Sequence, residues 1–195
     1  VPALPFGLSA AVAQGNLPMD VRPTDRTLGD PEAPIVVIEY ASFTCPHCAS
    51  VHVNTWPSIR DSYVADGHVL WVFREFARNQ PDLAAGIMAR CVADDQFFAM
   101  VETLFHQQAN WAAYDVQQTA YNLSRLGLMS GVSEDDYRAC LQNQDFANEI
   151  VDMRVEANDL YSIQATPTFI VNGEKVEGAR DFPFFQQMFD RLLTS

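Results

Sequence analysis

The chain has 195 residues, of which 48% are apolar, 11% aromatic and 19% charged, a composition that predicts one substantial folded core and excludes a disordered chain. Its 25 acidic and 12 basic side chains give a formal net charge of −13, and Lys175 is the only lysine, which argues against nucleic acid as a ligand. No apolar run reaches the roughly 18 residues that a membrane span needs.

We interpret residues 1–25 as an N-terminal tail. Ala11, Val12 and Ala13 end a mostly apolar stretch and resemble a signal-peptidase site, which predicts that the tail is the remnant of an export signal. The alternative is an ordinary tail that packs loosely on the domain, because no charged region precedes the apolar stretch.

The first strand is expected at residues 35–40, a β-branched run of the kind that is buried in parallel sheets. Residues 45–65 can form a helix, with Pro46 in its first turn and a kink or break at Pro57. Residues 68–73 are expected to form the second strand. Together these segments predict a β-α-β unit, in which the two strands are parallel.

Between residues 81 and 143 the apolar positions follow a helical period, which predicts an inserted block of helices. Asp94 and Asp95 are expected to cap its second helix, and Ser133 to cap its fourth. Asp145 is expected to cap a longer helix after the block. The apolar positions that indicate these helices are Leu83, Ile87 and Cys91; Phe97, Val101, Leu104 and Phe105; Val116, Ala120 and Leu123; Tyr137, Cys140 and Leu141; and Phe146, Ile150, Met153, Ala157 and Leu160.

The chain returns to sheet at residues 168–171 and 175–176, and the intervening Asn172 and Gly173 predict a two-residue hairpin turn. Asp181 is expected to cap a last helix. The apolar residues expected on the inner face of that helix are Phe185, Met188, Phe189 and Leu192. The overall pattern is a β-α-β half and a β-β-α half, separated by helices.

The sequence Cys-Pro-His-Cys at residues 45–48 lies where the first strand meets the first helix, the context in which a C-x-x-C indicates a redox pair. Free N–H groups and the positive end of the helix dipole favour a thiolate at Cys45, which predicts that Cys45 is the nucleophile. Cys48, one turn further on, is expected to resolve the mixed disulfide. The alternatives are a structural disulfide and half of a zinc site, although Cys91 and Cys140 occur singly.

The histidine between the two cysteines indicates the direction of the redox chemistry. An imidazole at His47 beside the Cys45 sulfur would favour the thiolate further. Each unit by which the pKa of Cys45 falls below the ambient pH stabilises the reduced state by about 1.4 kcal/mol, which raises a two-electron potential by roughly 30 mV. His47 therefore predicts an oxidant. We interpret His52 as a packing or surface histidine without a catalytic role.

Three segments of the chain resemble the DsbA family of thioredoxin-fold oxidoreductases. They are residues 30–40, residues 42–48, which contain the Cys-Pro-His-Cys sequence, and residues 165–169. The helical block between them resembles the family's inserted domain, and the resemblance covers about residues 26–193.

The expected fold class is therefore α/β, a thioredoxin fold with an inserted α-helical domain. We expect residues 26–80 and 144–195 to form the thioredoxin-like domain, and residues 81–143 to form the insertion.

The resemblance implies that Pro167 has a cis peptide bond and faces the Cys45–Cys48 pair. The backbone of Thr166 would then be free to hydrogen-bond an extended substrate chain lying over Cys45. The alternative is an ordinary trans proline at the first residue of a strand.

Glu39 occupies the position in the first strand where DsbA-like and thioredoxin-like proteins often keep a buried acid. This implies that Glu39 takes a proton from Cys48 when that thiol attacks the mixed disulfide. The alternative is a carboxylate at the strand edge, paired with an arginine such as Arg74.

Cys91 and Cys140 lie on the apolar faces of two insertion helices and could form a structural disulfide. Closing a loop of this size is worth roughly 4 kcal/mol in the loop-entropy model. Two free buried cysteines are the alternative. We favour the bridge, because four cysteines usually pair in an oxidising compartment and some DsbA-like proteins carry a second disulfide.

The leading functional hypothesis is a periplasmic thiol:disulfide oxidase. We expect a monomer without cofactor or metal that acts on unfolded or newly exported cysteine-containing proteins. The resemblance implies that a DsbB-like membrane partner reoxidises it. The alternatives are a disulfide isomerase or reductase, and a thioredoxin-fold binding or chaperone module with an inert disulfide; the redox potential of the pair distinguishes the three.

Overall fold

The computed structural model describes residues 17–113 and 115–194, and within them one mixed sheet has the strand order β1-β3-β2-β4-β5. The central strands β2 and β3 are parallel, and the other neighbouring pairs are antiparallel. The strands are β1 (Arg26–Leu28), β2 (Ile35–Ala41), β3 (Val69–Glu75), β4 (Thr168–Val171) and β5 (Glu174–Glu177). Ala11–Ala13, which resemble an export signal, lie outside the described residues.

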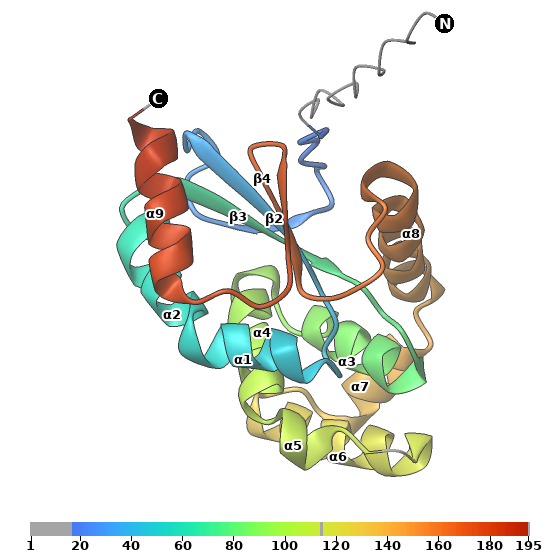
Figure 1. Cartoon of the computed structure of the whole chain (residues 1–195). Helices are drawn as coiled ribbons and strands as arrows, with labels where there is room; N and C mark the ends of the chain where they lie inside the picture. The colour runs from blue at the N-terminus through green and yellow to red at the C-terminus, as the bar shows by residue number, and fades with distance from the viewer. Residues whose placement is uncertain (1–16, 114, 195) are drawn as a thin grey trace, which may run out of the picture.

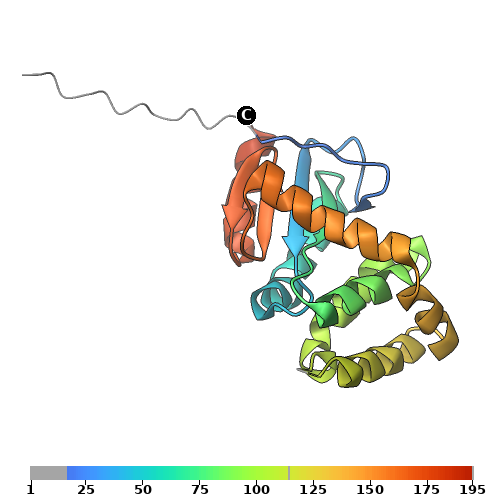
Figure 2. The same ribbon diagram turned by 90° about the vertical axis from the view of Figure 1, so that its right-hand side faces the viewer.

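Helices cover both faces of the sheet, and a separate group of helices lies beyond one end of it (Figure 1). Figure 2 shows α8 lying across one face of the sheet. The helices near the sheet are α1 (Pro46–Asn54), α2 (Trp56–Ile59), the π-helical turn η1 (Arg60–Val64), α8 (Gln144–Tyr161) and α9 (Phe182–Leu193). The inserted helices are α3 (Gln80–Arg90), the 3-10 turn η2 (Asp94–Gln96), α4 (Phe97–His106), α5 (Gln108–Trp111), α6 (Val116–Met129) and α7 (Glu134–Leu141).

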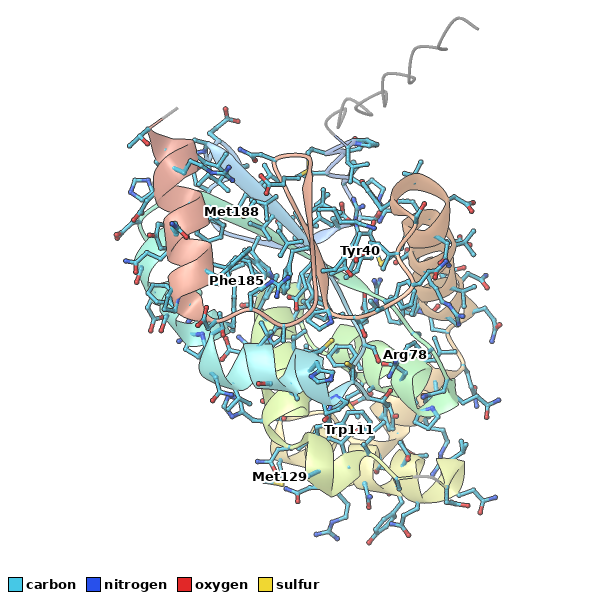
Figure 3. The ribbon with its side chains drawn as sticks, in the orientation of Figure 1. Tyr40, Arg78, Trp111, Met129, Phe185 and Met188 are labelled. Atoms are coloured by element: carbon cyan, nitrogen blue, oxygen red, sulfur yellow. A yellow bond between two sulfur atoms is a disulfide. The ribbon has the colours of Figure 1, made fainter. Side chains whose placement is uncertain are left out.

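Alternation along the strands gives each face of the sheet its own core. On one face, Trp71 packs with residues of α1, α2 and α9, including Phe185 and Met188, which Figure 3 shows on the side of α9 toward the sheet. On the other face, Tyr40 and neighbouring strand residues pack against Tyr161 of α8. The predicted α/β fold with a helical insertion is confirmed, while the proposed domain boundaries stay a prediction.

A third apolar cluster belongs mainly to the insertion. It contains residues of α3, α4 and α6, and it also contains Phe43, Cys45 and Cys48. The two cysteines therefore lie at the junction between the insertion and the sheet with its covering helices, which we call the sheet region.

The β-α-β unit and the hairpin form where the sequence predicts them. The predicted helix at residues 45–65 is divided into α1, α2 and η1, with the break at Thr55 and Pro57 in the first turn of α2. Asn172 and Gly173 both have positive φ (45° and 86°), as the turn between β4 and β5 requires. The strand that the sequence predicts as the first, at residues 35–40, is the second strand, β2. The short strand β1 precedes it and pairs with β3.

Two predicted helix caps are wrong and two are confirmed. Asp94 and Asp95 form the short turn η2, and α4 begins after Gln96 without a side-chain cap. Asn143, not Asp145, caps α8. The caps predicted at the starts of α7 and α9 accept the expected backbone N–H bonds.

Two positions assigned to apolar helix faces also differ. Val116 and Leu160 are about half exposed, at 45% and 49% of their surface. On α8 the buried position is Tyr161, at 3%. Its ring packs on Tyr40, so the sheet selects the residue next to the predicted one.

The register of the strands brings the separate parts of the site together. Glu39 lies opposite Phe169 and Tyr40 opposite Thr168 in the antiparallel pair β2·β4. Because β4 starts where β2 ends, the residues before Thr168 come beside the turn that follows β2. The sheet thus places residues more than 100 positions apart at one edge.

Candidate active site

Cys45 is the N-cap residue of α1, and a tight turn precedes it. The Cys45 N–H donates to the carbonyl of Ser42 at 3.0 Å, and the backbone of Cys45 is extended, with Pro46 in the first turn of the helix. This geometry leaves the first N–H groups of α1 free to face the sulfur. Cys45 and Cys48 are both buried and are free thiols in this structure.

The surroundings of Cys45 stabilise its thiolate. A hydrogen bond from the Cys48 thiol makes the largest contribution, and it lowers the pKa of Cys45 to about 5 together with the Thr166 side chain and the N–H groups of Cys48 and His47. Burial acts in the opposite direction. Ordinary cysteine ionises well above neutral pH, so this thiolate is present at neutral pH.

Cys48 has the opposite character. Burial raises its pKa well above the ordinary value, and the hydrogen bond to Cys45 and the negative charge of Glu39 raise it further. Two thiols separated by one helical turn are thus a thiolate and a protonated thiol, which is the division of roles expected for a nucleophile and a resolving cysteine.

The loop before β4 faces Cys45 from the opposite side. The Thr166–Pro167 peptide bond is cis, and the carbonyl oxygen of Thr166 lies 3.3 Å from the Cys45 sulfur, which donates to it as a thiol. The Thr166 hydroxyl is buried and has no hydrogen-bond partner within the described ranges. It is therefore available to donate to the sulfur once Cys45 ionises.

Glu39 is fully buried beneath the two cysteines. Its carboxylate oxygens lie 3.0 and 3.1 Å from Nε2 of His52, and Nε1 of Trp71 donates to it at 3.1 Å. The alternative pairing with Arg74 is wrong. Arg74 instead binds Asp25.

The structure places His47 differently from His52. The His47 side chain is exposed, and the part of His47 that lowers the pKa of Cys45 is its backbone N–H. His52 is buried, stacks on Phe105 with ring centroids 4.2 Å apart, and bonds Glu39 through Nε2. Its other ring nitrogen, Nδ1, has no hydrogen-bond partner in the described part of the chain.

Four residues of the site were not identified from the sequence: His52, Trp71, Asp82 and Gln108. The position of His52 four residues after Cys48, on the same face of the helix, is a signal that could have found it. Trp71 requires the strand register. Asp82 and Gln108 belong to the insertion and carry no local signal.

Cys91 and Cys140 form a disulfide that joins the end of α3 to α7. The bond lies at the end of α3 away from the cysteine pair. In residues 17–113 and 115–194 no group of three or more His, Cys, Asp or Glu side chains could hold a metal ion. None of the helices in these ranges has the length and hydropathy of a membrane span.

Comparisons with known proteins agree with this geometry. A family model described as thioredoxin matches residues 21–191. A putative protein-disulfide oxidoreductase of Rickettsia bellii is 32% identical over 159 residues, which cover 78% of this chain and 59% of that protein. Disulfide bond formation protein D of Bacillus subtilis is 25% identical, with 92% of this chain and 83% of that protein covered.

Among solved structures, alpha-DsbA1 of Wolbachia pipientis has a similar fold. Its TM-score is 0.83 at 28% identity, and the similarity covers 89% of this chain and 93% of that chain. This chain spans between 53% and 61% of the length of the five Rickettsia relatives.

Proposed function

The chain belongs to the thioredoxin family and is DsbA-like, and from this premise we propose that it is a thiol:disulfide oxidoreductase that donates the Cys45–Cys48 disulfide to other proteins. The observation that carries the proposal is the low pKa of Cys45, about 5, beside a Cys48 whose pKa is raised. A sulfur that is stable as an anion is a good leaving group, and its stability favours the reduced form of the pair. The protein is therefore an oxidant.

The reaction consists of two exchanges. A substrate thiolate attacks the sulfur of Cys45, the Cys45–Cys48 bond breaks, and Cys48 leaves with the electron pair and takes up a proton. A second substrate thiolate then attacks the substrate sulfur of the mixed disulfide and releases Cys45 as a thiolate. Two electrons pass from the substrate to the pair, and the substrate leaves with a disulfide.

Glu39 serves the proton transfer at Cys48. Its carboxylate is buried, and its charge acts on the Cys48 thiol. In the reverse of the first exchange, when the Cys48 thiol attacks the mixed disulfide, the Glu39 carboxylate accepts its proton. Thr166 and Pro167 form the opposite wall, where an extended substrate chain hydrogen-bonds the Thr166 backbone.

The substrates are unfolded or newly exported proteins with free cysteines, and the compartment is the periplasm. The Cys91–Cys140 disulfide supports an oxidising compartment, because such bonds are rare in reducing ones. After each turnover the reduced pair needs an oxidant, and the DsbA-like character favours a DsbB-like membrane protein for that step.

The test is the equilibrium of the protein with glutathione buffers, followed by trapping of free thiols. We expect a potential well above the roughly −180 mV of protein disulfide isomerase. Cys45→Ser, which keeps the fold but removes the leaving sulfur, should form no disulfide in a reduced, unfolded substrate. A potential near that of thioredoxin would make the protein a reductase, and a pair that does not exchange would leave a binding module.

A further inference from the structure

The turn that precedes Cys45 is held by a buried carboxylate of the insertion. Asp82, in the first turn of α3, accepts hydrogen bonds from the Ser42 hydroxyl at 2.6 Å and from the Phe43 N–H at 2.7 Å. It also accepts the N–H of Arg78 at 3.0 Å. Asp82 is 1% exposed, so these bonds are shielded from water.

A second side chain of the insertion holds the same turn through its carbonyl groups. Nε2 of Gln108, at the start of α5, donates to the carbonyl of Phe43 at 2.7 Å and to the carbonyl of Cys45 at 3.0 Å. The carbonyl of Cys45 also accepts the N–H of Ala49, which is the first hydrogen bond of α1. Gln108 therefore binds the group that joins the turn to the helix.

Aromatic packing from the insertion completes the contact. The Phe43 ring lies 5.0 Å from that of Phe105 on α4 and 5.6 Å from that of Phe73 on β3. Because the turn makes polar and apolar contacts with α3, α4 and α5, its conformation depends on the insertion.

We infer that Gln108 and Asp82 are positioning residues that set the acidity of Cys45 from the insertion. The inference rests on the proposed function, in which that acidity makes Cys45 a leaving group. Neither side chain touches the reacting sulfur. Each acts through the backbone of residues 42–45, which aims the sulfur at the N–H groups of α1.

The sign of the Gln108 effect follows from the charges. A thiolate at the N-cap is repelled by the carbonyl oxygens beside it and attracted by the N–H groups of His47 and Cys48. The Gln108 amide offsets the negative charge on two of those carbonyls and keeps the helix start in place. Its removal weakens both effects, and both changes raise the pKa of Cys45.

The decisive variant is Gln108→Met, which keeps the length of the side chain, removes the donors and changes no charge. We expect the pKa of Cys45, followed by the ultraviolet absorbance of its thiolate, to rise by about half a unit. The equilibrium constant for oxidising glutathione should fall about threefold. An unchanged pKa and equilibrium constant would overturn the inference.

Thr119→Val is the matched control. Thr119 is fully buried in α6, and among the described residues its hydroxyl hydrogen-bonds the N–H and carbonyl of Ala113, so this variant loses insertion hydrogen bonds without touching the turn. It should lower stability but leave the pKa of Cys45 unchanged. If the control raises the pKa as much as Gln108→Met does, the effect is one of general loosening and the inference is wrong.

Asp82→Asn tests whether the two residues act on one turn. In this variant an NH₂ group replaces one of the two oxygens that accept hydrogen bonds, so at least one donor loses its acceptor. The variant also removes a negative charge, so its own effect on the pKa of Cys45 combines opposite signs. The informative quantity is the effect of Gln108→Met measured in the Asp82→Asn background. We expect it to be smaller than in the wild type, because the turn is already released. Additive effects would exclude a shared mechanism.

These experiments are separable from the test of the proposed function. A wild-type potential near that of thioredoxin would refute the oxidase role. The change in the pKa of Cys45 between variants can still be measured in that case, because it is a difference between two reduced proteins.

Discussion

The sheet region and the insertion contribute to the active site in different ways. The sheet region supplies the chemical groups: β2 leads to the cysteine pair, and the residues before β4 form the opposite wall. The insertion supplies the surroundings, since Cys45 and Cys48 lie in its apolar cluster and Asp82 and Gln108 bind the turn. A thiolate in a buried site depends on its surroundings as much as on its own position.

The insertion therefore contributes directly to the chemistry of the active site. The sheet region alone would place a cysteine at a helix start, which already favours a thiolate. The insertion excludes water from the pair and fixes the turn. Changes in the two regions should therefore have similar effects on stability but different effects on the pKa of Cys45.

The largest expected effect comes from a matched pair of core substitutions, one in each region. Phe105→Ala in α4 and Phe189→Ala in α9 each remove a buried ring, and each should lower the free energy of unfolding by about 3–5 kcal/mol. Only Phe105 contacts Phe43 and His52. Urea unfolding of both variants should show similar losses, whereas the pKa of Cys45 should rise only in Phe105→Ala. Equal pKa values of Cys45 in the two variants would show that the insertion has no special effect on this thiol.

The second prediction concerns the reduced protein and pH. The pKa of Cys45 is lowered from 9.0 to about 5, so between these values the unfolded chain binds one more proton than the native protein. The free energy of unfolding then rises with pH by about 1.4 kcal/mol per unit. At pH 7 the contribution of Cys45 to that free energy is about 3 kcal/mol. This stability is fully present above about pH 9 and is lost as the pH falls toward 5.

Chemical unfolding of the reduced and oxidised proteins across this range checks the prediction. The oxidised protein has no thiol to titrate at Cys45 and should lack this slope. Cys48 adds little to the slope below about pH 8, because its pKa is raised in the native protein and an ordinary thiol of the unfolded chain is also still mostly protonated there. Parallel pH profiles for the two redox forms would mean that Cys45 is not a stabilised thiolate.

Much of the sheet region is predictable because its signals are local. A β-branched run followed by Pro46 indicates the β2–α1 junction, and Asn172 with Gly173 indicates the hairpin. The strand β1 could not be predicted, since three residues carry no periodic pattern. Asn143 and Asp145 are both good caps, so only the packed helix distinguishes them.

The surroundings of the active site could not be predicted because they depend on register. Glu39 lies opposite Phe73 on β3, and Arg74 lies opposite Tyr40, so the side chains of Glu39 and Arg74 point to opposite faces of the sheet. Without that register, an acid and an arginine on adjacent strands form a plausible pair. The contacts of Asp82 and Gln108 join distant parts of the chain and have no sequence signature.

The third prediction tests the proton transfer within the sheet region. Glu39→Gln should slow the attack of Cys48 on the mixed disulfide about tenfold at neutral pH, because the acceptor for its proton is lost while the absence of the Glu39 charge partly compensates. Rapid mixing of the glutathione mixed disulfide at Cys45 measures this step.

Glu102→Gln is the matched control for Glu39→Gln. Glu102, on α4, also accepts an indole N–H, from Trp56 at 2.8 Å, whereas the carboxylate whose charge acts on Cys48 is that of Glu39. The control should react at the wild-type rate. If Glu39→Gln also does, the buried carboxylate has a structural role only.

The smallest effect is expected from the residue that faces Cys45 across the site. Thr166→Val keeps the shape of the side chain but removes the buried hydroxyl that helps to lower the pKa of Cys45. We expect a rise in that pKa of about half a unit and a threefold fall in the equilibrium constant with glutathione. Thr168→Val is the control, because the Thr168 hydroxyl donates to the carbonyl of Ala165 at 2.9 Å and not to the sulfur.

Combining Thr166→Val with Gln108→Met decides how the two regions cooperate. Thr166 acts on the sulfur directly from the sheet region, whereas Gln108 acts on the backbone from the insertion. If the insertion only orients the turn, the sulfur keeps its position relative to Thr166 and the two shifts in the pKa of Cys45 should add. A combined shift smaller than the sum would mean that the insertion also sets the distance between Cys45 and Thr166, because Gln108→Met alone would already have weakened the contribution of Thr166 to the thiolate.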